Sequence, residues 1–384
     1  MVSKYDYFSD TLTKLQRQKR YRQLEPMVPI NAAYLLYQSV KMLSFCSHDY
    51  LGLADNPDSK KNAIKFLLQH GITASSECKD LYLSCQQQLE EKFGALLQRE
   101  SALFFPSRFE ANVTSLATLA RPGAIIFMDE ASHPSLVQGA TSSPARLQLY
   151  PHLRLDRLEH LLDDAGNVPK IIASESIFSS SGDVANLPTL IELADHFDAL
   201  LYVDDSHGFG VTGVDGMGLC GGLGEIDVVA GSLSKACGAY GGYVACSHLI
   251  RDFLVNCTPI KTSYLFPPSI IGAIDAALEM IPQMEGERKQ LQQRSHWLRA
   301  QLREMGFELP KATTPLLSIS FPDEEESIAF RDALKQEQIF IGPVRKAPEQ
   351  GCSINLALNI CHMPDHLSQL VNAIKGWRQV AAVS

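Results

Sequence analysis

The sequence predicts an α/β protein that has a mainly parallel sheet in a large domain and a smaller α/β domain after it. Between residues 101 and 235, short apolar runs alternate with helix-length segments, which is typical of strand–helix–strand units with right-handed crossovers. The runs at 200–203 and 227–231 are largely apolar and stop at polar residues, as expected of strands buried on both faces. A length of 384 residues suffices for two such domains.

The expected elements follow in chain order. A basic amphipathic helix is predicted at 5–25, a short strand and turn at 45–53, a helix at 58–70, a polar loop at 73–80 and a helix at 81–93. Strands are predicted at 101–105, 125–128, 146–150 and 170–178, with helices starting at 107 and 187 and a helix ending near 165. Further on, helices are expected within 269–305, at 327–336 and at 364–380, and strands at 316–321, 339–344 and 353–359. We expect an N-terminal helical arm at 1–45, a large domain at 46–275 and a small domain at 276–384.

Polar side chains follow two of the predicted strands. Asp204, Asp205 and His207 follow the first, and Ser232 and Lys235 end the second. In open α/β sheets, ligands bind at this carboxyl edge. Pyridoxal phosphate uses such a set, because a lysine carries its aldehyde as a Schiff base and an acidic group keeps its ring nitrogen protonated. The sequence therefore predicts Lys235 as the carrier, Asp204 opposite the ring nitrogen and His207 near the ring hydroxyl.

These residues also allow other interpretations. Taken singly, each is more typical of a solvated turn or a surface lysine. Ser232 to Lys235 also fits the S-x-x-K pattern, and Lys261 begins a loose K-T-G echo, but the S-D-N element of penicillin-binding enzymes is missing. The acids at 204 and 205 with His207 could bind a metal, yet no further ligand cluster with zinc-like spacing follows.

Two further positions are candidates for holding the cofactor. Ser107 precedes a helix that follows a strand, and free N–H groups at such a helix start can bind phosphate. His133 lies just after another strand, where an imidazole could stack on a flat ligand, although a lone histidine is more often structural.

Composition narrows the class of protein. A net charge of −9 argues against nucleic acid or an anionic membrane as the main partner. Nine scattered cysteines without a C-x-x-C pair fit a reducing, cytoplasmic location. We expect neither a signal peptide nor a membrane span, since no apolar run is long enough.

Five segments together resemble the α-oxoamine synthase family of fold-type I pyridoxal-phosphate enzymes. They are HDYLGLADNP (48–57), DEASHPSL (129–136), ESIFSSSGD (175–183), YVDDSHGFGVTGVDGMG (202–218) and GSLSKACGAYGGYV (231–244). The resemblance implies a seven-stranded large-domain sheet, condensation of an amino acid with an acyl-CoA thioester, usually with loss of carbon dioxide, and a homodimer with sites at the interface.

The resemblance also implies residue roles. Lys235 would carry the cofactor and later take the α-proton, Asp204 would pair with the ring nitrogen, and His133 would stack on the ring. His207 and Ser179 would hydrogen-bond near the ring oxygen. Phosphate contacts would come from the turn Ser107, Arg108 and Phe109, from Ser232, and from Ser263 of a second subunit.

Departures from the family pattern affect the substrate more than the cofactor. The small glycine of the phosphate turn is Arg108 here, and the C-terminal strand carries Ser353 and Asn355 where arginines are expected, one of which grips the substrate carboxylate. Either Arg108, Arg345 or another residue replaces that arginine, or the amino substrate is atypical. An activity like that of 8-amino-7-oxononanoate synthase is the first expectation. Synthesis of a long-chain aminoketone or an α-hydroxyketone signal precursor, transamination, and a non-catalytic subunit are the alternatives.

Overall fold

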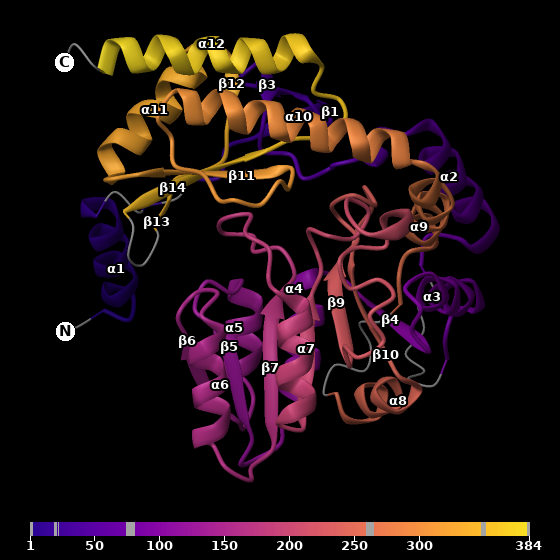
Figure 1. Ribbon diagram of the computed structural model, residues 1–384. Helices are drawn as coiled ribbons and strands as arrows, with labels where there is room; N and C mark the ends of the chain where they lie inside the picture. Colours follow the sequence, from indigo (N-terminus) through magenta and orange to yellow (C-terminus); the bar gives the residue numbers. More distant parts are fainter. Residues whose placement is uncertain are drawn as a thin grey trace.

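The computed structural model describes the chain in six stretches, with the two termini at one side of the molecule (Figure 1). These stretches are residues 3–18, 21, 23–73, 81–258, 265–346 and 351–381. The helices are α1 (Asp6–Arg17), α2 (Pro57–His70), α3 (Ser84–Leu96), α4 (Arg108–Leu119), α5 (Pro134–Thr141), α6 (Leu155–Asp164), α7 (Leu187–His196), α8 (His248–Cys257), α9 (Pro268–Met280), α10 (Glu285–Glu304), α11 (Glu324–Gln336) and α12 (Pro364–Ala381). Short 3-10 turns occur at Leu53–Asp55, Val214–Gly216 and Ile281–Gln283.

A seven-stranded sheet forms the centre of the large domain, in the order β4-β10-β9-β8-β7-β5-β6. Its strands are β4 (Ser101–Phe105), β5 (Ile125–Asp129), β6 (Arg146–Tyr150), β7 (Lys170–Glu175), β8 (Ala199–Asp204), β9 (Val228–Ser232) and β10 (Gly242–Cys246). The run from β6 through β5, β7 and β8 to β9 is parallel, whereas β10 is antiparallel to β9 and β4. The predicted mainly parallel sheet is confirmed. Strand β10, which follows a glycine-rich turn, was not among the predicted strands.

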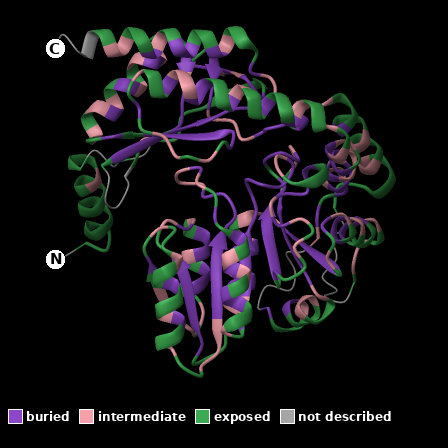
Figure 2. Cartoon of the chain, in the orientation of Figure 1, coloured by how far each residue is buried: buried purple, intermediate pink, exposed green. Residues whose placement is uncertain are grey.

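Apolar side chains fill both faces of this sheet. Most strand residues are buried while the outer faces of the surrounding helices are exposed (Figure 2). Strands β5, β9 and β10 are buried at every position, which explains why their sequences show no alternation of polar and apolar residues. The sheet is therefore held rigidly, and its strand ends are fixed platforms for functional groups.

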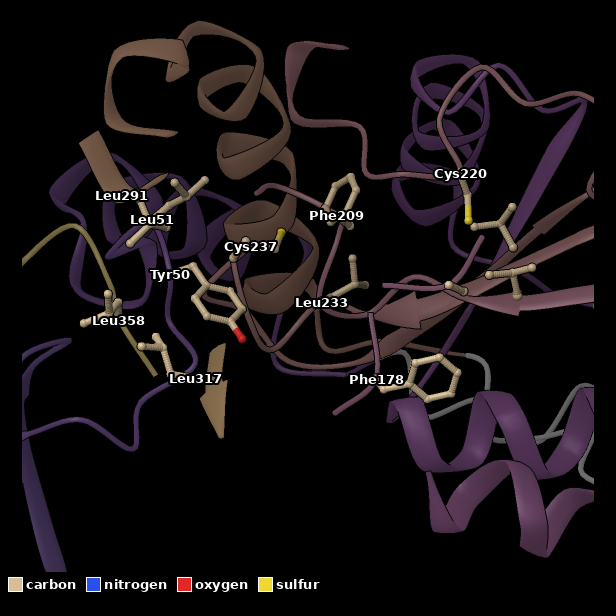
Figure 3. Close-up of a cluster of buried hydrophobic side chains, with 14 of the residues drawn as sticks. Tyr50, Leu51, Phe178, Phe209, Cys220, Leu233, Cys237, Leu291, Leu317 and Leu358 are labelled. Atoms are coloured by element: carbon tan, nitrogen blue, oxygen red, sulfur yellow. The ribbon is translucent and has the colours of Figure 1, made fainter. Parts of the chain in front are cut away.

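The core of the large domain continues into the C-terminal sheet. Tyr50 and Leu51, near the N-terminal side, belong to the same buried cluster as Leu317 and Leu358 (Figure 3). Burial of each such side chain contributes about 1.5–3 kcal/mol. The C-terminal part is thus seated firmly over the carboxyl edge of the large sheet, and its strands can supply residues there.

The C-terminal part contains a three-stranded sheet in the order β11-β14-β13, with β11 (Leu316–Phe321), β13 (Arg345–Lys346) and β14 (Cys352–Ala357). Helices α10, α11 and α12 lie beyond it in Figure 1. The predicted strand at 339–344 is wrong in extent, since β12 covers only Ile339–Phe340 and β13 starts a separate strand.

The N-terminal segment departs from the expected helical arm over residues 1–45. Helix α1 ends at Arg17, and the chain then forms β1 (Met27–Asn31), β2 (Tyr34–Tyr37) and β3 (Val40–Ser44). The β2–β3 turn has positive φ at Gln38 and Ser39, residues that are not typical of such turns, so the hairpin could not be predicted from turn residues. Strand β3 pairs in parallel with β12, which joins this segment to the C-terminal part. The division at residues 45 and 275 stays a prediction.

Among the described helices, none is both long and apolar enough to cross a membrane.

Candidate active site

A cavity of about 350 Å³ opens at the carboxyl ends of the parallel strands, beneath the C-terminal sheet. Register pairing sets Glu175, at the end of β7, beside Asp204, at the end of β8, and Asp204 beside Ala230 of β9. Eight of the predicted site residues line the cavity, namely Ser107, Arg108, Phe109, His133, Ser179, His207, Ser232 and Lys235. Asp204 is fully buried behind the lining. Ser263 falls outside the described residues.

Lys235 presents a buried amine to this cavity. It follows β9 by three residues and is 8% exposed, and its Nζ has no hydrogen-bond partner among the residues that the structure describes. Burial, together with the charge of Arg108, lowers the pKa of Lys235 well below its usual range. A lowered pKa makes an amine a better nucleophile and proton acceptor near neutral pH than a solvated lysine is.

Asp204 is held ionised by a network of donors. Its Oδ2 accepts from Asn112 Nδ2 at 2.6 Å and from Arg108 Nε at 2.5 Å, and its Oδ1 accepts from the Ser206 amide at 3.0 Å. Burial favours the neutral acid, but the charges of Arg108 and Lys235 outweigh it and lower the pKa of Asp204 to about 2.

Arg108 lies in the predicted turn, and its side chain is directed into the site. Its backbone begins α4, at the predicted phosphate turn, but its guanidinium turns inward and bridges Asp204 and Glu175, with Nη2 at 2.6 Å from Glu175 Oε2. The reason is electrostatic, because two buried carboxylates need a cation and no other is within ion-pair distance of them among the described residues. Asp204 Oδ2 is thus shared between Arg108 and Asn112, and the pairing of Asp204 with a ring nitrogen stays a prediction.

The phosphate turn itself has the predicted geometry. Ser107 is the N-cap of α4, and its side chain accepts from the Glu110 amide at 3.0 Å. Strand β10 passes so close that a Cβ on Gly242 would meet the Arg108 nitrogen at 2.6 Å. Across the turn, the hydroxyls of Ser232 and Ser234 are 2.8 Å apart. The backbone N–H groups at such a helix start can bind an anion, and these hydroxyls lie beside it.

The histidines of the site are neutral. Burial and the charge of Arg108 lower the pKa of His133 to about 3, and its Nδ1 lies 2.7 Å from the Ser135 hydroxyl. Burial and the charge of Lys235 lower the pKa of His207 well below its usual range. His207 Nδ1 lies 2.7 Å from the Tyr50 hydroxyl. Neutral imidazoles offer flat faces and hydrogen-bonding nitrogens, and they add no positive charge beside Asp204.

Several residues of the site were missed or left undefined by the sequence analysis. Asn112 links Asp204 to Ser135, and Glu175 holds the backbone amide of His133 at 2.8 Å. Tyr50 belongs to the segment 48–57, which carries part of the family resemblance but for which no residue role was predicted. Position 175 ends a predicted strand beside Asp204, and this placement could have identified Glu175.

The residues present fit pyridoxal phosphate at most positions. The orphaned amine of Lys235 suits the aldehyde, the α4 N-terminus with Ser232 suits the phosphate, and His133 suits the ring face. A ring nitrogen bonded to Asp204 would share the carboxylate with Arg108, which bonds Oδ2, and with the Ser206 amide, which bonds Oδ1.

Comparisons with known proteins agree with this arrangement. The aminotransferase class I and II family model matches residues 40–374. An 8-amino-7-oxononanoate synthase from Trichlorobacter lovleyi is 35% identical over 95% of this chain and 96% of its own length. A serine palmitoyltransferase from S. paucimobilis with a bound PLP–myriocin aldimine superposes with a TM-score of 0.90 at 20% identity over 100% of both chains, which shows the fold.

The structure of an 8-amino-7-oxononanoate synthase from Francisella tularensis superposes with a TM-score of 0.78 at 25% identity, over 89% of this chain and 98% of that one. The fold-type I architecture inferred from the sequence motifs is confirmed. With its buried lysine and aspartate at adjoining strand ends, the chain belongs to the aminotransferase class I and II family and, within it, to the α-oxoamine synthases.

Proposed function

We propose that this chain is a pyridoxal-phosphate-dependent acyltransferase that condenses an amino acid with an acyl-CoA thioester. The observation that carries the proposal is the buried Lys235 amine, which has no hydrogen-bond partner in the described part of the chain and faces a cavity shared with His133 and the α4 N-terminus. Burying a lysine amine without a partner lowers the stability of the fold. Groups in such an environment are found mainly at functional sites. Full-length similarity to 8-amino-7-oxononanoate synthases supports the same reaction type.

The proposed condensation joins the amino acid to the acyl group and releases CoA. A bond forms between the amino acid's α-carbon and the thioester carbonyl carbon, the C–S bond breaks, and CoA leaves as a thiol with a proton. The α-carboxylate then leaves as carbon dioxide, and a proton takes its place. When bound, pyridoxal phosphate supplies an electron sink that makes the α-proton acidic.

The chain's own residues position and move the proton. Lys235, whose pKa is lowered by burial, would hold the cofactor through its aldehyde, and its Nζ is placed to accept the α-proton of the amino acid. Asp204 supplies a fixed negative charge, which Asn112 orients. The N–H groups at the start of α4 and the hydroxyl of Ser232 hold the phosphate, and His133 covers the ring.

The finer assignment belongs to the same proposal. Biotin-precursor synthesis from alanine and an acyl-CoA is the first candidate, since the relatives carry the name 8-amino-7-oxononanoate synthase. We propose a cytoplasmic homodimer in which Ser263 of one subunit completes the phosphate site of the other.

Replacing Lys235 with alanine tests the proposal. Thiol release from acyl-CoA in the presence of amino acid should fall to background, measured with a thiol reagent, while Lys289→Ala, an exposed lysine on α10 paired with Glu285, should leave it unchanged. Borohydride reduction of the cofactor-loaded protein should attach the cofactor to the peptide that contains residue 235. Turnover by Lys235→Ala, or half-transamination without any acyl-CoA, would contradict the acyltransferase assignment.

A further inference from the structure

Two turns at the carboxyl edge of the large sheet present residues to the cavity. One runs from Asp129, at the end of β5, to His133. The other runs from Glu175, at the end of β7, to Asp183 and carries Ser179. The carboxylate of Glu175 joins the two turns, because its oxygens accept from the backbone amides of His133 and Ser179 at 2.8 and 3.2 Å. The positions of His133 and Ser179 beside the cavity therefore depend on one another.

His152 joins the same two turns a second time, through their acids. It follows β6, and β5 lies between β6 and β7 in the sheet (Figure 1). Its Nδ1 is 2.8 Å from Asp129 Oδ1, and its Nε2 is 3.4 Å from Asp183 Oδ2. The imidazole meets the ring of Phe178 edge to face, with the centroids 4.6 Å apart. Since His152 is not among the residues that line the cavity, it acts through the turns and not on a bound molecule.

The backbone around His152 is held in a shape that places the imidazole between the two acids. Leu153 has a φ of 58°, in the left-handed region that residues with a side chain rarely adopt. Its amide donates to Asp129 Oδ2 at 2.8 Å, and the His152 amide donates to Glu130 Oε1 at 3.1 Å. Such backbone strain persists where surrounding contacts fix it, and it is concentrated at functional sites. The turn after β6 thus presents His152 in one orientation.

The charges around His152 favour its protonated form. Burial opposes that form, but hydrogen bonds to Asp129 and Asp183 raise the pKa of His152 to about 9. The hydrogen bond from His152 in turn lowers the pKa of Asp183, and Arg299 of α10 adds to this effect. The other charged groups nearby are Glu130 and, on the same segment as His152, Arg154, which pairs with Asp156. At neutral pH an imidazolium therefore links two carboxylates by charge-assisted hydrogen bonds.

We propose that His152 is a positioning residue whose imidazolium clamps the turns 129–133 and 175–183 together and so fixes His133 and Ser179 for the cofactor. The Ser179 carbonyl also accepts from Asn355 of β14 at 2.9 Å, so the clamp reaches the C-terminal sheet. The site loosens when the imidazolium loses its proton, as the pH rises through about 9. This inference rests on the proposed function and refines it.

Hydrogen exchange of the cofactor-free protein, followed by mass spectrometry, tests the clamp itself. The variants are His152→Gln, Asp183→Asn and the double variant, and His160→Gln, an exposed histidine on α6, is the matched control. We expect both turns to exchange about tenfold faster in His152→Gln, with β8 unchanged. The double variant should exchange no faster than the single ones, because residues that share one interaction do not have additive effects. The control should match the wild type.

The cofactor-loaded protein tests the positioning role. In His152→Gln, the ratio of the absorption bands of the bound cofactor should change, and kcat for thiol release should fall about tenfold near neutral pH, since small misplacements at a site slow the reaction strongly. The KM for acyl-CoA should change by less than about twofold. The wild-type to His152→Gln ratio of kcat should then fall toward one as the pH rises through about 9. His152→Lys, which keeps its charge at that pH, should retain kcat there, and it also serves if His152→Gln is unstable.

The other outcomes separate this inference from the proposed function. Faster exchange with unchanged kcat and absorbance would show that the clamp only stabilises the fold. A ratio of kcat that does not vary with pH would show that the charge of His152 is not needed. Either result, or unchanged exchange in His152→Gln, overturns the inference and leaves the proposed function intact. A wild type that binds the cofactor but releases no thiol overturns the proposed function, and the exchange and absorbance results then still decide the role of His152.

Discussion

Replacing Arg108 with methionine probes the electrostatic arrangement at the centre of the site. The Arg108 side chain is 10% exposed and bridges two fully buried carboxylates, those of Asp204 and Glu175. Methionine keeps much of the side-chain length but leaves both carboxylates without a cation. Removing one partner of a buried ion pair costs about 3–5 kcal/mol.

This cost predicts a measurable change in thermal stability. An unfolding entropy of about 2.1 cal/mol/K per residue gives roughly 0.8 kcal/mol/K for a chain of 384 residues. The midpoint of the cofactor-free variant should therefore fall by about 4–6 °C. Adding pyridoxal phosphate should restore stability more in the variant than in the wild type. In the variant, the protonated ring nitrogen would replace the positive charge that Asp204 loses with Arg108, and it would not compete with a guanidinium for the carboxylate. We expect cofactor binding to tighten by about tenfold or more, since each 1.4 kcal/mol is tenfold.

Scanning fluorimetry and a cofactor titration measure both effects. Arg154→Met is the matched control, because Arg154 pairs with Asp156 at 57% and 54% exposure and such surface pairs contribute little. An unchanged midpoint for cofactor-free Arg108→Met would refute the structural role of the ion pair. Weaker cofactor binding by the variant would refute the competition between Arg108 and the ring nitrogen, and would mean that the side chain holds the cofactor directly.

Two further predictions concern pH and backbone packing. Burial opposes the charged form of His152, but hydrogen bonds to Asp129 and Asp183 raise its pKa to about 9. Since this folded-state pKa exceeds the unfolded value, the stabilisation is fully present below pH of about 6.5 and is lost as pH rises through about 9. Thermal midpoints of the wild type should fall more over this range than those of His152→Gln, by the equivalent of roughly 3 kcal/mol, and parallel pH profiles would contradict the assignment. Gly242→Ala should lower cofactor affinity and stability, because its Cβ would meet the backbone of the turn that begins α4 at 2.6 Å. Gly376→Ala within α12, where a Cβ meets nothing within 4 Å, should instead raise stability by up to about 1 kcal/mol; similar effects of both substitutions on melting would refute the packing argument.

The sequence by itself determined the sheet and the functional edge. Strands that are buried on both faces appear in the sequence as continuous apolar runs, and the first polar residue after a run marks the end of the strand. For this reason Asp204, Ser232 and Lys235 could be assigned to strand ends, and parallel strands must bring those ends to one edge. His133 followed from the same rule. The same rule did not predict hairpin β2–β3 or strand β10. The hairpin turn lacks the usual turn residues, and β10 follows a glycine-rich segment.

Only the tertiary structure decided how the charges of the site are distributed. Arg108 could bind a phosphate, a substrate or a protein carboxylate; its sequence position is compatible with all three. Its actual partners, Asp204 and Glu175, lie 96 and 67 residues away and meet it only when three strand and helix ends converge. Arg345 reaches the cavity because β13 pairs with β14 over the strand ends. Local patterns fix which residues lie at an edge, whereas the direction of a long charged side chain depends on the burial and field created by the whole fold.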